Sequence, residues 1–279
     1  FHAGSFGVKA GAGEQEKTLL AHGPPATFCA MKRIITLLAL LSVVASHAAD
    51  TRLFEMRTYY ANPGKLDELN TRFKDHTVDL FKRHGMVNIG YWVPADNPDN
   101  KLIYVLAYKD MEARDKAWKA FFADPDWKAA YTASIDGGKL VKKVDKVFMQ
   151  ATDYSTKIAK GMTGGPERTF QLRIYNTLPG RLKNLQARFR DHTVGLFEKH
   201  GISNIAYWTP IKGQETHGSQ LIYIIAGKSE AGIKGSFKKF GQDPDWKKAR
   251  TASVSDGQII KPKGIDATFM SPTDYSPLW

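Results

Sequence analysis

Two segments of the chain alternate between apolar and polar residues, one starting at Phe54 and the other at Phe170. A period of two residues is typical of a β-strand with two different faces. One face carries Phe, Met, Leu, Ile or Thr, and we expect it to pack under helices. The other face is charged, polar or aromatic, and we expect it to stay open; it carries Glu55, Arg57, Tyr59, Gln171, Arg173 and Tyr175.

The period changes to three and four residues after Pro63-Gly64, which predicts a turn and then a helix to about Arg83. Gly85 stands at the position of a helix C-cap. Strands are predicted over 87–94, 102–108 and 141–150. Between the last two, a helix starts at Asp110 and restarts at Asp124-Pro125, where Asp suits the N-cap and Pro the first turn. The order β-α-β-β-α-β is the ferredoxin-like plan.

The whole pattern occurs twice, with a constant offset of 116 residues that rises to 119 after Pro210. Asp75-His76-Thr77-Val78 returns as Asp191-His192-Thr193-Val194, and Thr152-Asp153-Tyr154-Ser155 returns as Thr273-Asp274-Tyr275-Ser276. The sequence therefore predicts an α+β fold with one module at 49–156, a linker at 157–168 and a second module at 169–279. Two open sheet faces would cover each other as an intramolecular dimeric α/β barrel with a partly polar interior, where a ligand could bind.

The N-terminal region has the pattern of an exported protein. Lys32 and Arg33 precede an apolar run from Ile34 to Ala45, and small residues follow it. This order predicts a signal peptide over 31–48, with cleavage after Ala48 and a periplasmic or secreted product. Residues 1–30 are then an upstream extension. The apolar run is too short to span a bilayer, so we expect no stable membrane insertion after cleavage.

Composition narrows the chemistry. The net charge of +12 comes from basic residues spread along the chain, which argues against nucleic-acid binding. The single Cys29 precedes the predicted signal peptide, so the mature chain has no thiol nucleophile and no disulfide. We find no metal-binding spacing, no glycine-rich phosphate loop and no serine-hydrolase motif.

His76 and His192 are the candidate catalytic residues, because an imidazole at the edge of the buried helix stripe could act as a base or as a haem ligand. A half-buried histidine bonded to a neighbouring carboxylate or backbone carbonyl is the alternative. Arg57 and Arg173 are candidate ligand-binding residues in the middle of a strand. Glu55 could pair with Arg57, but its counterpart is the neutral Gln171. Arg173 would then be freer to bind an anion, which would make one module structural and the other functional. An arginine that only braces the sheet is the alternative.

Six more residues are candidates for the barrel interior. Aromatic rings with an amide nearby suit a flat aromatic ligand, and they suit a packed barrel centre equally well. These residues are Tyr59, Tyr175, Asn88, Asn204, Trp92 and Trp208.

Several of these elements together resemble the NIPSNAP domain family. They are Arg57-x-Tyr59, Pro63-Gly64, Phe73-x-x-His76, Tyr91-Trp92 and Asp124-Pro125-Asp126-Trp127, and they recur in the second copy. The resemblance implies the dimeric α/β-barrel fold. Mitochondrial members are linked to mitophagy and vesicle-related interactions, roles that a periplasmic relative cannot share literally. The wider superfamily includes cofactor-free monooxygenases of quinol-type aromatics and haem proteins.

Three hypotheses about function follow. The first is a protein that binds a small aromatic or anionic molecule in the barrel, with cofactor-independent oxygenase-type chemistry based on His76 or His192. The second is a non-catalytic interaction module, and the third is a haem protein. A cavity of roughly 300 Å³ or more, lined by these groups, favours the first. Exposed sheet edges would also allow a higher oligomer.

Overall fold

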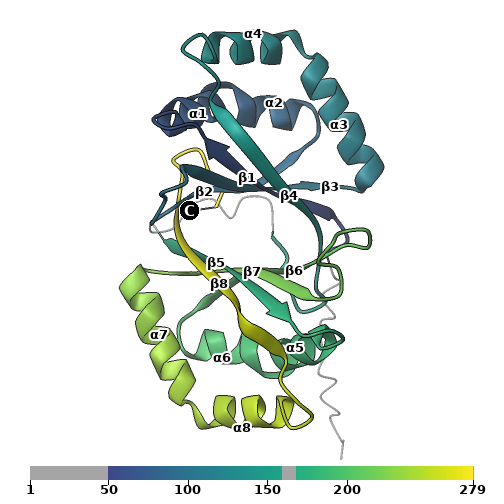
Figure 1. Ribbon diagram of the computed structural model, residues 1–279, viewed down its shortest axis with the longest axis vertical. Coiled ribbons are helices and arrows are strands. Elements are labelled where there is room, and N and C mark those ends of the chain that lie inside the picture. The colour runs from purple at the N-terminus through teal and green to yellow at the C-terminus, as the bar shows by residue number, and fades with distance from the viewer. Residues whose placement is uncertain (1–49, 159–167, 279) are drawn as a thin grey trace, which may run out of the picture. The chain divides into compact units, whose positions relative to one another are not determined.

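The computed structural model describes residues 50–158 and 168–278, which are coloured in Figure 1. The predicted extension, the signal peptide and most of the linker lie outside these residues. Within the described ranges, no helix has both the length and the apolar content needed to cross a membrane.

Each repeat forms the predicted elements in the predicted order. Module 1 contains β1 (Leu53–Ala61), α1 (Leu66–Arg72), η1 (Phe73–Thr77), α2 (Val78–Arg83), β2 (Val87–Pro94), β3 (Lys101–Tyr108), α3 (Met111–Ala123), α4 (Pro125–Ser134) and β4 (Val141–Ala151). Module 2 contains β5 (Thr169–Thr177), α5 (Leu182–Arg188), η2 (Phe189–Thr193), α6 (Val194–Lys199), β6 (Ser203–Pro210), β7 (Gln220–Gly227), α7 (Glu230–Gln242), α8 (Pro244–Ser253) and β8 (Ile260–Pro272).

The local signals act as expected. The carboxylate of Asp110 accepts a hydrogen bond from the N–H of Ala113 at 2.8 Å, and Asp124 caps α4 through the N–H of Asp126 at 2.8 Å. Gly85 ends α2 with φ of 78°, in the left-handed region that glycine adopts without steric cost.

The eight strands close into one antiparallel barrel in the order β1-β3-β2-β8-β5-β7-β6-β4. Each module closes the barrel with its last strand: β4 pairs with β6, and β8 pairs with β2. Helices α1–α4 cover one side of the barrel and α5–α8 the other (Figure 1). The predicted barrel of two fused modules is therefore confirmed.

The two faces of β1 and β5 are the reverse of the prediction. Phe54, Met56, Phe170 and Leu172 belong to the apolar cluster inside the barrel, together with side chains from all the other strands. The ring of Phe54 lies 5.6 Å from that of Trp208 in the other module. The polar-aromatic face lies under the helices instead, because each charged group there has a partner on that side. The barrel interior is accordingly apolar and not partly polar.

A β-bulge corrects a second expectation, that Asn88 and Trp92 both lie in the barrel interior. The pairing of β2 with β3 shifts by one residue between Asn88 and Gly90, and β6 shifts in the same way after Asn204. An extra residue exchanges the two faces of a strand. Trp92 and Trp208 therefore point into the barrel, whereas the amide of Asn88 donates to the carbonyl of Val78 under the helices.

A π-helical turn interrupts the first helix of each module. In η1 the N–H of Val78 donates to the carbonyl of Phe73, five residues earlier, and the Thr77 hydroxyl donates to the carbonyl of Arg72 at 3.1 Å. The wider turn brings Thr77 to the core, where it is buried. His76 is exposed as a result, and the identical turn η2 exposes His192.

The segment that follows each last strand crosses to the other module. The N–H of Thr273 donates to the carbonyl of Tyr91, and the N–H of Tyr91 donates to the Ser276 hydroxyl, both at 3.0 Å. Tyr275 stacks on Phe73 with ring centroids 6.4 Å apart. Residues 152–155 make the matching contacts with Tyr207 of module 2. We call residues 152–155 and 273–276 the crossed tails.

Candidate ligand-binding site

A large, mainly apolar cavity lies in module 2, between the sheet and its covering helices. Its volume is about 550 Å³. We call it the module 2 cavity. Its lining comes from β5, β8, the loop before β8 and the five helical segments of module 2. The lining residues are Arg173, Tyr175, Arg188, Phe189, Thr193, Phe197, Phe237, Phe240, Trp246, Arg250, Val254, Gln258, Ile259, Ile260 and Ile265.

Arg173 reaches the cavity from the middle of β5. Its Nε donates to the hydroxyl of Tyr223 at 2.9 Å, and its two terminal nitrogens donate to the Gln171 amide oxygen at 2.9 Å and the Tyr175 hydroxyl at 3.1 Å. All three acceptors are neutral. The ring of Phe237 covers the guanidinium at 4.7 Å.

Arg188 ends α5 immediately before the π-turn and is 7% exposed. One terminal nitrogen donates to the Ser253 hydroxyl at 3.2 Å, and the Trp246 ring lies 5.4 Å from the guanidinium carbon. Its Nε is buried and has no hydrogen-bond partner among the described residues. Burial, together with the neighbouring Arg250, lowers the pKa of Arg188 below its usual value.

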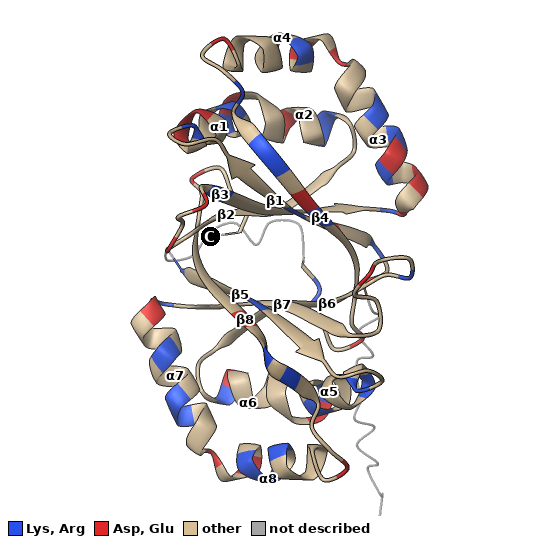
Figure 2. Cartoon of the chain, viewed as in Figure 1, with Lys and Arg blue, Asp and Glu red and all other residues tan. Residues whose placement is uncertain are grey.

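The module 2 cavity has an uncompensated positive charge. Three arginines line it, and none of the described lining residues carries a carboxylate. The excess of basic residues extends over the whole of module 2. Residues 168–278 include 17 Lys and Arg but nine Asp and Glu, whereas residues 50–158 include 18 Lys and Arg and 16 Asp and Glu. Figure 2 shows basic residues on α7 and α8. A buried cation without a counter-ion is costly, so the cavity favours an anion.

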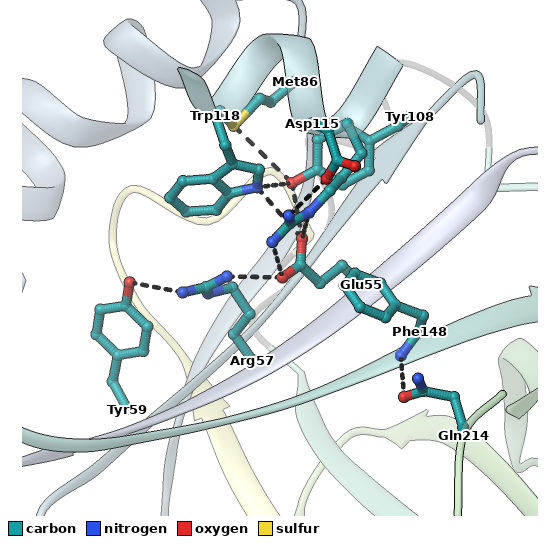
Figure 3. A network of polar contacts seen from close by, with 10 residues as sticks. Glu55, Arg57, Tyr59, Met86, Tyr108, Asp115, Trp118, Phe148 and Gln214 are labelled. Atoms are coloured by element: carbon teal, nitrogen blue, oxygen red, sulfur yellow. Dashed lines mark hydrogen bonds and ion pairs between the residues drawn. The ribbon is translucent and has the colours of Figure 1, made fainter. Parts of the chain in front are cut away.

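The same place in module 1 has its own anion. Glu55, which is fully buried, accepts from Arg57 at 2.6 Å and from two nitrogens of Arg114 at 3.1 Å each. Tyr108 and the indole of Trp118 complete its contacts, at 3.1 and 3.3 Å (Figure 3). Burial raises the pKa of Glu55, but the hydrogen bonds and charges of the two arginines outweigh it and leave the pKa below its usual value.

Module 2 lacks this cluster because four of its residues differ. At the 116- and 119-residue offsets, Glu55 becomes Gln171, Tyr108 becomes Gly227, Arg114 becomes Ile233 and Trp118 becomes Phe237. Ile233 packs over Gly227 so closely that a Cβ there would lie 2.6 Å from its Cγ1. A fifth difference adds charge, because Arg250 replaces Tyr131.

The structure separates the residues singled out from the sequence. Arg173 and Tyr175 meet in the module 2 cavity, and Arg57 and Tyr59 lie at the equivalent place in module 1. Trp92 and Trp208 are inside the barrel, and the two asparagines brace the helices. His76 and His192 lie on the outer helical surface, away from the barrel. The sequence analysis did not predict Arg188, Trp246 and Arg250 as site residues. For Arg188 a signal was available, because an Arg-Phe pair precedes Asp-His-Thr in both modules.

The barrel has a smaller cavity of about 300 Å³ at one end. Its apolar wall includes Met56, Val147 and Ile222, and residues of the loop before β7 form part of its rim. None of the site residues predicted from the sequence lines it. The cavity reaches the volume of roughly 300 Å³ that a small-molecule site requires, but the residues expected to bind the ligand do not line it.

The closed barrel of two ferredoxin-like halves defines a dimeric α/β-barrel protein. The model of the NIPSNAP family matches residues 54–156 and 170–277, and the chain belongs to this family. No curated protein matches the sequence significantly.

One solved structure shows the same fold over most of the chain, and two solved NIPSNAP proteins are similar to less than half of it. An anthrone oxidase-like protein is 11% identical, with a TM-score of 0.54, covering 80% of this chain and 92% of its own. An uncharacterized NIPSNAP domain protein from Burkholderia xenovorans is 25% identical over 34% of this chain and 90% of its own, with a TM-score of 0.31. A NIPSNAP family protein from Agrobacterium tumefaciens is 21% identical over 38% and 92%, with a TM-score of 0.33.

Haem fits the module 2 cavity poorly. Histidine, cysteine and methionine are the common axial ligands of haem iron, and none is among the described lining residues. The hydroxyl of Tyr175, a rarer type of ligand, already accepts a hydrogen bond from Arg173.

Proposed function

We propose that this protein binds a small organic anion with an apolar body in the module 2 cavity. One observation carries the proposal: Arg188 is buried at the wall of a 550 Å³ cavity, its Nε has no partner in the described chain, and no lining carboxylate balances it. The volume is within the range of small-molecule sites, roughly 300–1,000 Å³.

The chemistry of the walls supports both parts of the ligand. Charge-assisted hydrogen bonds from a guanidinium to an anion are stronger than those to neutral groups. The rest of the lining is mainly aromatic and aliphatic, so burying an apolar body there adds about 25 cal/mol per Å². The site thus suits a molecule with one charged end.

We propose binding without oxygenase chemistry for this site. Proton abstraction needs a base within hydrogen-bond reach of the substrate. The described lining includes no histidine, aspartate or glutamate, and His192 is on the outer surface. The signal-peptide pattern at Met31 supports a site that works outside the cytoplasm.

A matched pair of variants tests the proposal. Arg188→Gln removes the guanidinium from the module 2 cavity, and Arg72→Gln removes its counterpart in module 1. We expect aromatic acids, but not their amides, to raise the melting temperature of the wild-type protein and of R72Q by mass action. R188Q should lose this shift. An equal shift in R188Q, checked for folding by circular dichroism, would contradict the proposal.

A further inference from the structure

In module 1, the place that corresponds to the module 2 cavity holds a carboxylate from the chain itself, that of Glu55. The Glu55 side chain lies at a fixed place on the sheet, bound edge-on by Nε and one terminal nitrogen of Arg114 and by Arg57. Its carboxylate therefore has the contacts of a bound ligand, supplied by the chain itself.

We infer that the ligand of module 2 is a carboxylic acid, and that Glu55 is the built-in substitute for it in module 1. This inference rests on the proposed function and names its ligand class. Module 2 keeps the strand arginine and its aromatic cover: Arg57 lies 4.3 Å from the Trp118 ring, and Arg173 lies 4.7 Å from the Phe237 ring. It has lost the anion, together with the anion's partners Arg114 and Tyr108.

The exposed edges of the guanidinium groups favour a planar anion. Phe237 covers a face of Arg173, and Trp246 lies against Arg188. The Nε of Arg188 has no partner in the described chain. A carboxylate can accept two parallel hydrogen bonds from the edge of a guanidinium group. A tetrahedral phosphate is best bound by donors on several sides, whereas a carboxylate can be bound by a single guanidinium edge.

The mainly apolar lining of the module 2 cavity suits the apolar part of the acid. Ile233 packs down on Gly227 where Arg114 and Tyr108 stand in module 1, so that polar cluster is gone. Phe240 and Trp246 stay in contact, 4.4 Å apart. An aryl carboxylate, with the ring among these aromatics and the acid toward Arg188 or Arg173, satisfies both requirements.

The experiment restores the internal carboxylate. Gln171→Glu places the acid of module 1 at the equivalent position of module 2, beside Arg173. Gln242→Glu adds the same charge at an exposed position of α7 and is the matched control. Calorimetric titration compares 2-naphthoate with 2-naphthyl phosphate, two anions with the same ring system.

We expect 2-naphthoate to bind the wild-type protein and Q242E with dissociation constants within about twofold of each other, and Q171E at least tenfold more weakly. Unchanged binding to Q171E would overturn the inference. If the phosphate binds as tightly as the carboxylate or more tightly, the ligand class is wrong while the anion site of the proposed function stands. If neither anion binds at millimolar concentration, both fail.

Discussion

At the scale of single residues, Gly90 of module 1 and its counterpart Ala206 of module 2 differ by one methyl group. A Cβ on Gly90 would lie 2.3 Å from Cη2 of Trp92, whereas the matching position in module 2 is Ala206. We expect Gly90→Ala to force the indole of Trp92 out of place and to lower the free energy of unfolding by about 1–3 kcal/mol.

Urea unfolding measures this effect, and Ala206→Gly is the reverse substitution. It should cost only about 0.5–1 kcal/mol, the usual penalty of a glycine within a strand. Equal losses in the two variants would show that the Trp92 contact does not limit this position.

Two aspartates predict how stability responds to acid. The hydrogen bond from His84 is the main cause that lowers the pKa of Asp124 from 3.8 to about 2, and Lys199 with His200 likewise lowers the pKa of Asp243. A carboxyl whose pKa is lower in the folded state stabilises the fold above its unfolded value. That contribution is lost as the pH falls from about 4 toward 2.

We therefore expect the melting temperature of the wild-type protein to fall over this pH range more steeply than that of Asp124→Asn or Asp243→Asn. Asparagine keeps the N-cap but removes the titration. Asp136→Asn, at an exposed site, should follow the wild-type curve. Parallel curves for all four proteins would contradict this assignment.

Residue types and alternation were enough to predict the strands and the caps, and to single out Arg173 beside the neutral Gln171. They did not predict which face of β1 and β5 lies under the helices and which lies inside the barrel. Glu55 and Arg57 lie under the helices because α3 supplies Arg114 and Trp118, a contact between distant segments that periodicity cannot show. Arg188 was missed because it precedes the expected stripe by one position.

At the scale of elements, the π-turns set the positions of Arg72 and Arg188. The Thr193 hydroxyl donates to the carbonyl of Arg188 at 3.1 Å, and Thr77 does the same for Arg72. Thr193→Val and Thr77→Val keep the side-chain shape but remove this bond, so each should lower the unfolding free energy by about 1 kcal/mol.

The two variants should separate in a binding assay. Thr193→Val loosens the turn that holds Arg188, so affinity for the anionic ligand should fall several-fold. Thr77→Val acts on the other module and should leave affinity unchanged. A matching loss in both would mean that the turn does not position the arginine.

The helices and strands themselves were predictable to within a few residues, but their irregularities were not. A β-bulge and a π-turn each insert one residue without breaking the hydrophobic pattern. The β-bulge places Asn88 and Trp92 on opposite faces of the strand. The π-turn places Thr77 in the core and leaves His76 at the surface.

At the scale of the whole molecule, the crossed tails join the modules in addition to the barrel seams. The hydroxyl of Tyr275 donates to Asn70 at 2.7 Å, while the Tyr154 ring lies 5.5 Å from that of Tyr207. We expect Tyr275→Ala to cost about 2–4 kcal/mol, somewhat less than a fully buried aromatic.

Hydrogen exchange shows which elements lose stability when a tail tyrosine is removed. Tyr275→Ala should lower the protection of α1, η1 and β2, which are in the module that does not contain Tyr275. Tyr154→Ala should act on α5, η2 and β6 of module 2 in the same manner. Loss of protection confined to the mutated module's own elements would rule out a bracing role for the tails.

Repetition in the sequence was enough to predict two modules and their joint barrel. The matching tails were visible as a repeat as well, but their crossing was not, since each tail contacts residues that precede or follow it by up to about 200 positions. The difference between an occupied and an open site emerged only when Glu55 and Gln171 were seen in their surroundings.

The crossed tails also affect the order in which the two modules can finish folding during synthesis. Module 1 leaves the ribosome first, yet the Ser276 hydroxyl that meets the backbone of Tyr91 is added 185 residues later. At roughly 5–20 residues per second, its partner arrives about 10–40 s afterwards. During that interval the surface around Phe73 and Tyr91 lacks the cover that Tyr275 and Ser276 provide, so we expect module 1 to reach its full stability only after the second tail has been made.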